Sequence, residues 1–294
     1  MTSQRTATAG PTSIDPRTDL GTVRLTVADL ARSRSFYDRA LGLQAIDLDD
    51  GSLALGAGGE RPLIELRGDS AAPALNRRAT GLFHLAVLLP SRLDLALALV
   101  RLSEARWPLD GASDHLVSEA LYLSDPDGNG IELYRDRPRE QWRYADGQLE
   151  MATLPLDIDD VLRELERADG FQRLAPPDTR IGHVHLQVSN LDESEAFYNG
   201  VLGFDVVVRG YPGALFVSAG GYHHHIGLNT WNSAGASPPP LGSIGLRCFQ
   251  VQLPSADALG LVVDRASATG VPTEAVNGDT LVRDPSGNGV LLTS

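Results

Sequence analysis

The sequence predicts an α+β protein made of four β-α-β-β-β modules, because two of its segments each occur twice. The segment Gly-Thr-Val-Arg-Leu-Thr-Val, which starts at Gly21, returns as Gly-His-Val-His-Leu-Gln-Val at Gly182. The segment Asp-Pro-Asp-Gly-Asn-Gly at 125–130 returns as Asp-Pro-Ser-Gly-Asn-Gly at 284–289. Proline and glycine at these places are typical of a tight turn that leads into a last strand.

The modules are expected at about 20–68, 80–135, 180–230 and 242–293. Each begins with alternating apolar and polar residues, as in a strand with one buried face, and continues into an amphipathic helix. The four helices are expected at 29–40, 93–105, 192–199 and 256–268. Glycine-rich turns separate the shorter strands that close each module.

The repeats divide the chain into four regions. Residues 1–19, rich in Thr, Ser, Ala, Pro and Arg, are predicted to be a disordered tail. The first pair of modules spans 20–135, and the second pair spans 180–294. Residues 136–179 break the repeat and are expected to be a linker with one helix, because apolar residues keep a roughly helical spacing after Asp157.

The composition narrows the class of partner. The net charge is −13, and all basic residues are Arg. Such an acidic surface argues against nucleic acid and anionic membranes as partners. No run reaches transmembrane length, and the first residues lack the apolar stretch of a secretory signal, so a cytoplasmic protein is expected. The single cysteine, Cys248, excludes a disulfide framework, and its neighbours predict a buried strand position.

Histidine is confined to the middle of the chain. The seven histidines are His84, His115, His183, His185, His223, His224 and His225. Imidazole is the commonest protein ligand for transition metals and the side chain best suited to proton transfer near neutral pH. The clustering therefore predicts one buried site that is assembled from the middle of the chain.

Together these features resemble the vicinal oxygen chelate superfamily, which includes glyoxalase I, fosfomycin- and bleomycin-resistance proteins and extradiol ring-cleaving dioxygenases. The shared features are paired modules, a histidine on the first strand, the Asp-Pro-x-Gly-Asn turn and a glutamate just after it. The resemblance covers about 20–135 and 180–293. Within the superfamily, 118–132 and 220–229 are most similar to two-domain catechol 2,3-dioxygenases of the bacterial CatE type.

The resemblance implies that two modules form one cup-shaped mixed sheet and that metal ligands point inward from the first and last strand of each module. Aligning the repeats assigns these positions to Thr22 and Glu65, His84 and Glu132, His183 and Gly227, and Cys248 and Leu291. Only modules two and three combine two histidines with one glutamate: His84, His183 and Glu132. This ligand set suits Fe(II), with Mn(II) or Zn(II) as alternatives, and Gly227 would leave the fourth corner open.

A competing arrangement pairs modules one and two. It offers Glu65, His84 and Glu132 with Thr22 nearby. One imidazole and two carboxylates would suit Mn(II), Mg(II) or Zn(II) in a glyoxalase-like or transferase-like site. This pairing leaves the histidines of module three unexplained. His185 also stays open as an alternative to His183, because strand alternation puts both on one face.

The resemblance also implies roles for the remaining polar residues. His224 is expected to be the acid-base histidine, because it lies three residues before the inward corner of its strand. Tyr122 is expected to hydrogen-bond the substrate. His115 departs from the usual spacing, where Ser113 stands, but is kept as a catalytic candidate. The other histidines expected to contact substrate are His185, His223 and His225. Core packing or solvent exposure stays an open, simpler explanation for each.

The activity that the resemblance implies is extradiol cleavage of a catechol-type ring with O2 and Fe(II). The partners would be a small aromatic diol and O2, without nucleic acid or membrane, and a homo-oligomer is left open. Two other classes also stay open. One is a divalent-metal isomerase or thiol transferase that does not use O2, and the other is a metal-free protein that sequesters small molecules.

Overall fold

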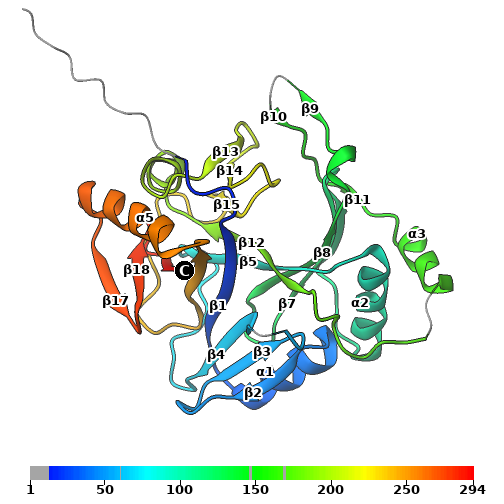
Figure 1. Cartoon of the computed structure of the whole chain (residues 1–294). Helices are drawn as coiled ribbons and strands as arrows, with labels where there is room; N and C mark the ends of the chain where they lie inside the picture. Colours follow the sequence, from blue (N-terminus) through cyan, green and yellow to red (C-terminus); the bar gives the residue numbers. More distant parts are fainter. Residues whose placement is uncertain (1–12, 60, 146–147, 168–169) are drawn as a thin grey trace, which may run out of the picture.

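The computed structural model describes residues 13–59, 61–145, 148–167 and 170–294. These residues form two large mixed β-sheets with helices packed against them (Figure 1), and a separate two-stranded sheet of β9 and β10. The predicted α+β fold with two curled mixed sheets is confirmed. Within the described ranges, no helix is long and apolar enough to cross a bilayer.

The first sheet has eight strands in the order β17-β18-β19-β16-β1-β4-β3-β2. Their bounds are β1 Asp19–Val27, β2 Gln44–Asp47, β3 Leu53–Gly56, β4 Ile64–Gly68, β16 Gly245–Gln252, β17 Thr273–Val276, β18 Asp279–Arg283 and β19 Gly289–Thr293. Modules one and four therefore share this sheet, and β1 pairs with β16 in antiparallel orientation.

The second sheet has nine strands in the order β11-β6-β7-β8-β5-β12-β15-β14-β13. Their bounds are β5 Gly81–Leu88, β6 Gly111–Asp114, β7 Ser118–Ser124, β8 Gly130–Asp136, β11 Leu154–Pro155, β12 Arg180–Gln187, β13 Asp205–Val208, β14 Ala214–Ser218 and β15 Ile226–Asn229. Modules two and three thus share one sheet, and the alternative pairing of modules one and two is wrong. Each sheet joins one module from each half of the chain.

Each expected module helix begins at a polar cap. Asp29 and Asn190 each accept hydrogen bonds from two backbone N–H groups of the first turn, and Ser91 and Ser255 each accept one. The helices are α1 Leu30–Phe36, α2 Arg92–Glu104, α4 Leu191–Glu195 and α5 Ala256–Ala268. Wider π-helical turns, Tyr37–Leu41 and Ala196–Val201, continue α1 and α4.

The predicted boundary of the disordered tail, at residue 19, is wrong. Ile14 is 4% exposed and belongs to the main hydrophobic core, and its N–H donates to the carbonyl of Gly203 at 2.7 Å. Burial of an apolar side chain therefore orders the end of the segment, so residues 13–19 are not a disordered tail. Residues 1–12 of the predicted tail lie outside the described residues.

The linker holds one short helix, α3 Ile158–Leu162, followed by a 3-10 turn over Arg163–Arg167. It also contains the two-residue strands β9 Tyr144–Ala145, β10 Gln148–Leu149 and β11, and a 3-10 turn over Arg139–Gln141. The repeats gave no sign of these strands. β11 pairs with β6, so the linker extends the sheet of modules two and three instead of bypassing it.

The repeated Asp-Pro turns connect the two sheets. Asp125 accepts hydrogen bonds from the backbone and side chain of Asn129, and the hydroxyl of Tyr37 in module one donates to it at 3.2 Å. In the other half, the hydroxyl of Tyr198 donates to Asp284 at 3.0 Å. Each tyrosine thus joins the helical segment of one module to the last-strand turn of the following module, which lies in the other sheet.

Tyr37→Phe and Tyr198→Phe should each lower the free energy of unfolding by about 1–2 kcal/mol, because each change leaves a buried carboxylate oxygen with one donor fewer. Urea unfolding followed by circular dichroism measures this. Tyr144 is 60% exposed, so Tyr144→Phe should change the free energy by less than about 0.5 kcal/mol. Equal stability of all three variants would show that the tyrosine bonds do not hold the sheets together.

Candidate metal centre

Three adjacent strands at the middle of the second sheet bring the predicted ligands together. β5 lies between β8 and β12. In the strand register, Ala86 of β5 pairs with Glu132 of β8 on one side and with His183 of β12 on the other. His84 lies two residues before Ala86 and therefore projects from the same face. The three side chains converge over the small, fully buried Ala86.

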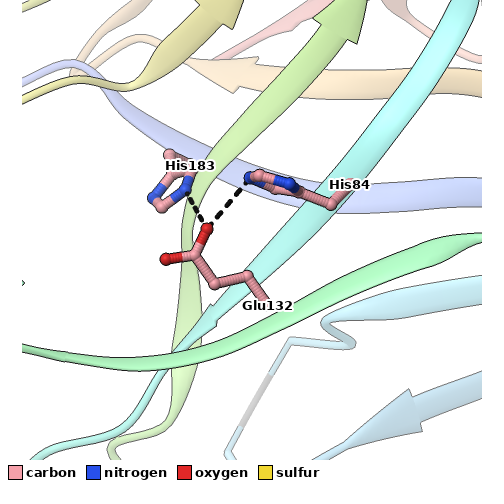
Figure 2. A group of neighbouring side chains, drawn as sticks. All are labelled: His84, Glu132 and His183. Atoms are coloured by element: carbon pink, nitrogen blue, oxygen red, sulfur yellow. Dashed lines mark hydrogen bonds and ion pairs between the residues drawn. The ribbon is translucent and has the colours of Figure 1, made fainter. Parts of the chain in front are cut away.

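Figure 2 shows the imidazoles of His84 and His183 directed toward one oxygen of Glu132. Nε2 of His84 lies 2.9 Å from Oε2 of Glu132, and Nε2 of His183 lies 3.1 Å from it. One ligand atom from each residue falls within 4.8 Å of the others. All three side chains are at least nine-tenths buried. Of the His, Cys, Asp and Glu groups in the described ranges, this is the set whose atoms converge closely enough to hold a metal.

The geometry fits a divalent metal ion. Two ligands at about 2.1 Å from a metal and at right angles to each other lie about 3 Å apart, close to both measured separations. Nε2 of His84 is buried without a hydrogen-bond partner, although it faces the carboxylate. A buried polar atom without a partner is costly, and a metal ion would satisfy it.

The protonation states also suit a metal. Burial by itself would raise the pKa of Glu132, but the charge of the two facing imidazoles and the hydrogen bond with His183 outweigh burial and hold this pKa well below its ordinary value. Burial lowers the pKa of His183 to about 4. At neutral pH the site therefore offers a carboxylate and a neutral imidazole, the forms that bind metals.

The metal centre opens into a cavity of about 470 Å³. Residues 151–153 of the linker form part of the cavity wall. They can do so because the linker joins the edge of this sheet through β11. Other lining residues are His84, Glu132, His183, His115, Tyr122, His185, Tyr211, Phe216, His224 and Trp231. Aromatic or imidazole rings make up 10 of the 22 lining residues, so the cavity suits a flat ring with a few polar substituents.

His115 and Tyr122 form a hydrogen-bonded pair in this wall. Nδ1 of His115 lies 2.7 Å from the carbonyl oxygen of Ala152, which can only accept, so Nδ1 carries the proton. Nε2 of neutral His115 is then an acceptor, and the hydroxyl of Tyr122 donates to it at 2.7 Å. Burial and the charge of Glu132 raise the pKa of Tyr122 well above 10, so it remains a neutral phenol.

A second chain of hydrogen bonds fixes the tautomer of His224. Nε2 of His223 lies 2.9 Å from Oδ1 of Asp136 and donates to it. Nδ1 of neutral His223 must then accept, and Nδ1 of His224, 2.8 Å away, donates to it. The lone pair of His224 is therefore on Nε2. Sequence reasoning missed Asp136, although its position at the end of β8, after Glu132, could have suggested it.

The structure does not place His223 and His225 at the cavity, in contrast to the prediction that they contact substrate. His223 is fully buried between Asp136 and His224, and Nδ1 of His225 accepts from the backbone N–H of Ala219 at 3.1 Å. Burial lowers the pKa of His225 to about 3. Both residues support the connection between β14 and β15, which carries His224.

The prediction that Gly227 leaves an open corner is wrong. A Cβ at this position would lie 2.9 Å from Cγ of His185, so the imidazole of His185 fills the space. His185 pairs with Gly227 across β12 and β15, and its ring also packs against Phe83 and Trp231. It lines the cavity, but it is His183 that faces Glu132.

The fold and this site define a family. A family model described as the Glyoxalase/Bleomycin resistance protein/Dioxygenase superfamily matches residues 19–133 and 180–292. The chain belongs to this superfamily, and the resemblance stated from the sequence is confirmed. Over 278 residues the chain is 47% identical to the catechol-2,3-dioxygenase of Bacillus subtilis (strain 168), an alignment that covers 93% of this chain and 96% of that relative.

Solved structures support the fold. One from Bacillus subtilis subsp. subtilis str. 168, described as a candidate dioxygenase, has a TM-score of 0.62 at 16% identity and covers 94% of this chain and 84% of its own. Glyoxalase I from Zea mays has a TM-score of 0.57 at 16% identity, covering 94% and 92%. At this level of identity these structures support the architecture and not the chemistry.

His84→Ala and Glu132→Ala should each reduce bound divalent metal from about one ion per chain to less than about one-tenth, because each removes a direct ligand. Elemental analysis after anaerobic loading and dialysis measures this. Cys248→Ala is the matched control, since Cys248 occupies the position of His84 in the other sheet, and it should keep the metal. Full metal content in both ligand variants would place the metal elsewhere.

Proposed function

We propose that this chain is an Fe(II)-dependent extradiol dioxygenase that cleaves a catechol-type ring beside its diol with O2. The chain is an extradiol dioxygenase by its 47% identity, over most of its length, to a catechol-2,3-dioxygenase. The observation that carries the proposal for Fe(II) is the buried set of two imidazoles and one carboxylate, which opens into an aromatic cavity. This set is the facial triad of non-haem Fe(II) oxygenases.

His84, His183 and Glu132 would hold the metal from one side and leave its other side toward the cavity. When bound, Fe(II) supplies adjacent positions for the diol and O2 and passes electron density between them. Phe216 and Trp231, which line the cavity, would hold the ring and limit access of water to the site. Mn(II) and Zn(II) remain the alternative metals.

Tyr122 and His115 would take the proton that the diol loses on binding. The oxygen of Tyr122 has a free lone pair for the substrate hydroxyl, while its own proton already points to Nε2 of His115. A proton can therefore pass from the diol to Tyr122 as the tyrosine proton moves to His115. This transfer leaves Tyr122 neutral throughout, as its raised pKa requires.

His224, whose ring lies beside that of His183, would be the general acid-base residue. Its ring centroid lies 4.1 Å from that of His183, and its available lone pair on Nε2 can accept a proton and return it. Asp136 and His223 act as positioning residues, because they hold the tautomer. The expected cytoplasmic location and a homo-oligomer remain predictions.

Oxygen uptake by Fe(II)-loaded protein tests the proposed function. Addition of catechol should consume about one O2 per catechol, and Zn(II)-loaded protein should consume none, because Zn(II) has no redox chemistry. Turnover of a substrate without O2 would instead support the glyoxalase-like or transferase-like alternative. Protein that retains no metal at all would support a metal-free binding function.

His224→Phe should keep the metal and bind catechol but lose about 10²–10⁴-fold in kcat, the usual contribution of a positioned acid-base group. Cys248→Ala changes a buried side chain in the other sheet, outside this cavity, and should keep the native rate. Stopped-flow measurement separates binding from cleavage. A native rate in His224→Phe would move the acid-base role to another residue.

Asp136→Asn should lower kcat by about tenfold or more with little change in KM, because an amide can donate to His223 and so reverse both tautomers. The ¹⁵N NMR spectrum of Zn(II)-loaded protein reports which nitrogen of His224 carries the proton. Native protein should show it on Nδ1. An unchanged tautomer together with an unchanged kcat would show that Asp136 and His223 do not position the proton of His224.

A further inference from the structure

The sheet of modules one and four contains a second cavity, which has no role in the proposed chemistry. Its volume is about 720 Å³, and Cys248 and Leu291 line it. These residues occupy the repeat positions of His84 and Glu132 in the metal cup. Two of the metal donors are thus replaced by a thiol and an alkyl side chain, so a metal is not the expected occupant.

The lining of this cavity is strongly basic. It contains five arginines, namely Arg24, Arg67, Arg77, Arg247 and Arg283, whereas the acidic residue in the lining is Asp69. The contrast is large, because the whole chain carries a net charge of −13. The basic character is therefore local to the cavity and is not a property of the protein surface in general.

Neighbouring carboxylates neutralise only part of this charge. Nε of Arg24 lies 3.0 Å from one oxygen of Glu65, and Nη1 of Arg247 lies 3.3 Å from the other, so the two arginines share one carboxylate. Arg67 forms no ion pair with any residue in the described ranges. With Glu65, Asp69 and Asp50 counted, the last because its carboxylate also interacts with Arg247, an excess of two positive charges remains around the cavity.

Such an excess is costly unless an anion offsets it. Guanidinium groups that line one cavity repel one another, and an anion in the cavity would replace this repulsion with charge-assisted hydrogen bonds. Arginine presents a planar fork of donors that matches a carboxylate or a phosphate better than lysine does. The remaining wall includes Leu75, Leu246 and Leu281, which provide an apolar surface beside the charges.

We propose that the cavity between β1, β16 and residues 238–245 binds an organic carboxylate with an apolar body. The arginines would bind its carboxylate, and the leucines would contact its hydrocarbon part. The site is separate from the metal centre, because Cys248 and Leu291 line this cavity and not the smaller one. Phe83 and Arg77 line both cavities and form a shared wall.

Benzoate is the probe, used with full-length, metal-free protein so that the outcome does not depend on the proposed enzyme activity. Isothermal titration calorimetry should give saturable binding of benzoate, and the neutral analogue benzamide should bind at least about tenfold more weakly. Arg67→Gln with Arg283→Gln removes two exposed cavity arginines and should weaken benzoate at least about tenfold. Arg39→Gln with Arg143→Gln makes the same charge change at exposed positions outside the lining and should leave binding unchanged.

Alkylation of Cys248 locates the binding, since it is the only cysteine in the sequence. Benzoate at saturation should slow alkylation by iodoacetamide several-fold, as measured by mass spectrometry, whereas benzamide at the same concentration should not. Inorganic phosphate should protect Cys248 more weakly than benzoate, because it has no apolar part. Benzoate binding without protection, equal affinity for benzamide, equal protection by phosphate, or no binding would each overturn the proposal.

Discussion

The antiparallel pairing of β5 with β12 is the contact on which the rest of the site depends. These strands belong to opposite halves of the chain, and Figure 1 shows them side by side at the centre of the molecule. Their register sets Ala86 opposite His183, and the parallel pairing with β8 adds Glu132 on the other side. A slip of one residue would turn the ligands to the opposite face of the sheet. The metal centre is therefore a product of strand register, fixed by the burial of both sheet faces.

The sequence carried most of the information about the fold. Repeats gave the modules, and the inward positions of the repeats gave His84, Glu132 and His183 as a set, because a strand with period two fixes which side chains share a face. Which residues pair across two modules depends on the tertiary fold and could not be predicted from the sequence. For that reason Gly227 was expected to leave an open corner, whereas the ring of His185 fills it.

Hydrogen-bond partners were equally hidden, whether they lie in a distant segment, as Asp136 does, or across a turn, as Ala219 does. The roles of His223 and His225 changed because Asp136 and the backbone of Ala219 satisfy them. The linker contributes Ala152 to the cavity wall and to His115, and no local pattern around residue 152 indicates this. The burial of Ile14 was hidden too, because a single apolar residue in a polar segment gives no sign that it packs against the core.

The two large sheets repeat one architecture with different side chains at matching positions. In one, imidazoles and a carboxylate converge on a point suited to a metal ion, and in the other, arginines surround a larger space. In the proposed function, one iron ion binds where the two halves of the chain meet. Anomalous X-ray diffraction at the iron edge, from crystals of Fe(II)-loaded protein, tests it most directly. A single strong peak is expected within coordination distance of His84, Glu132 and His183. A peak beside Glu65, or no peak where β5 pairs with β12, would contradict this placement.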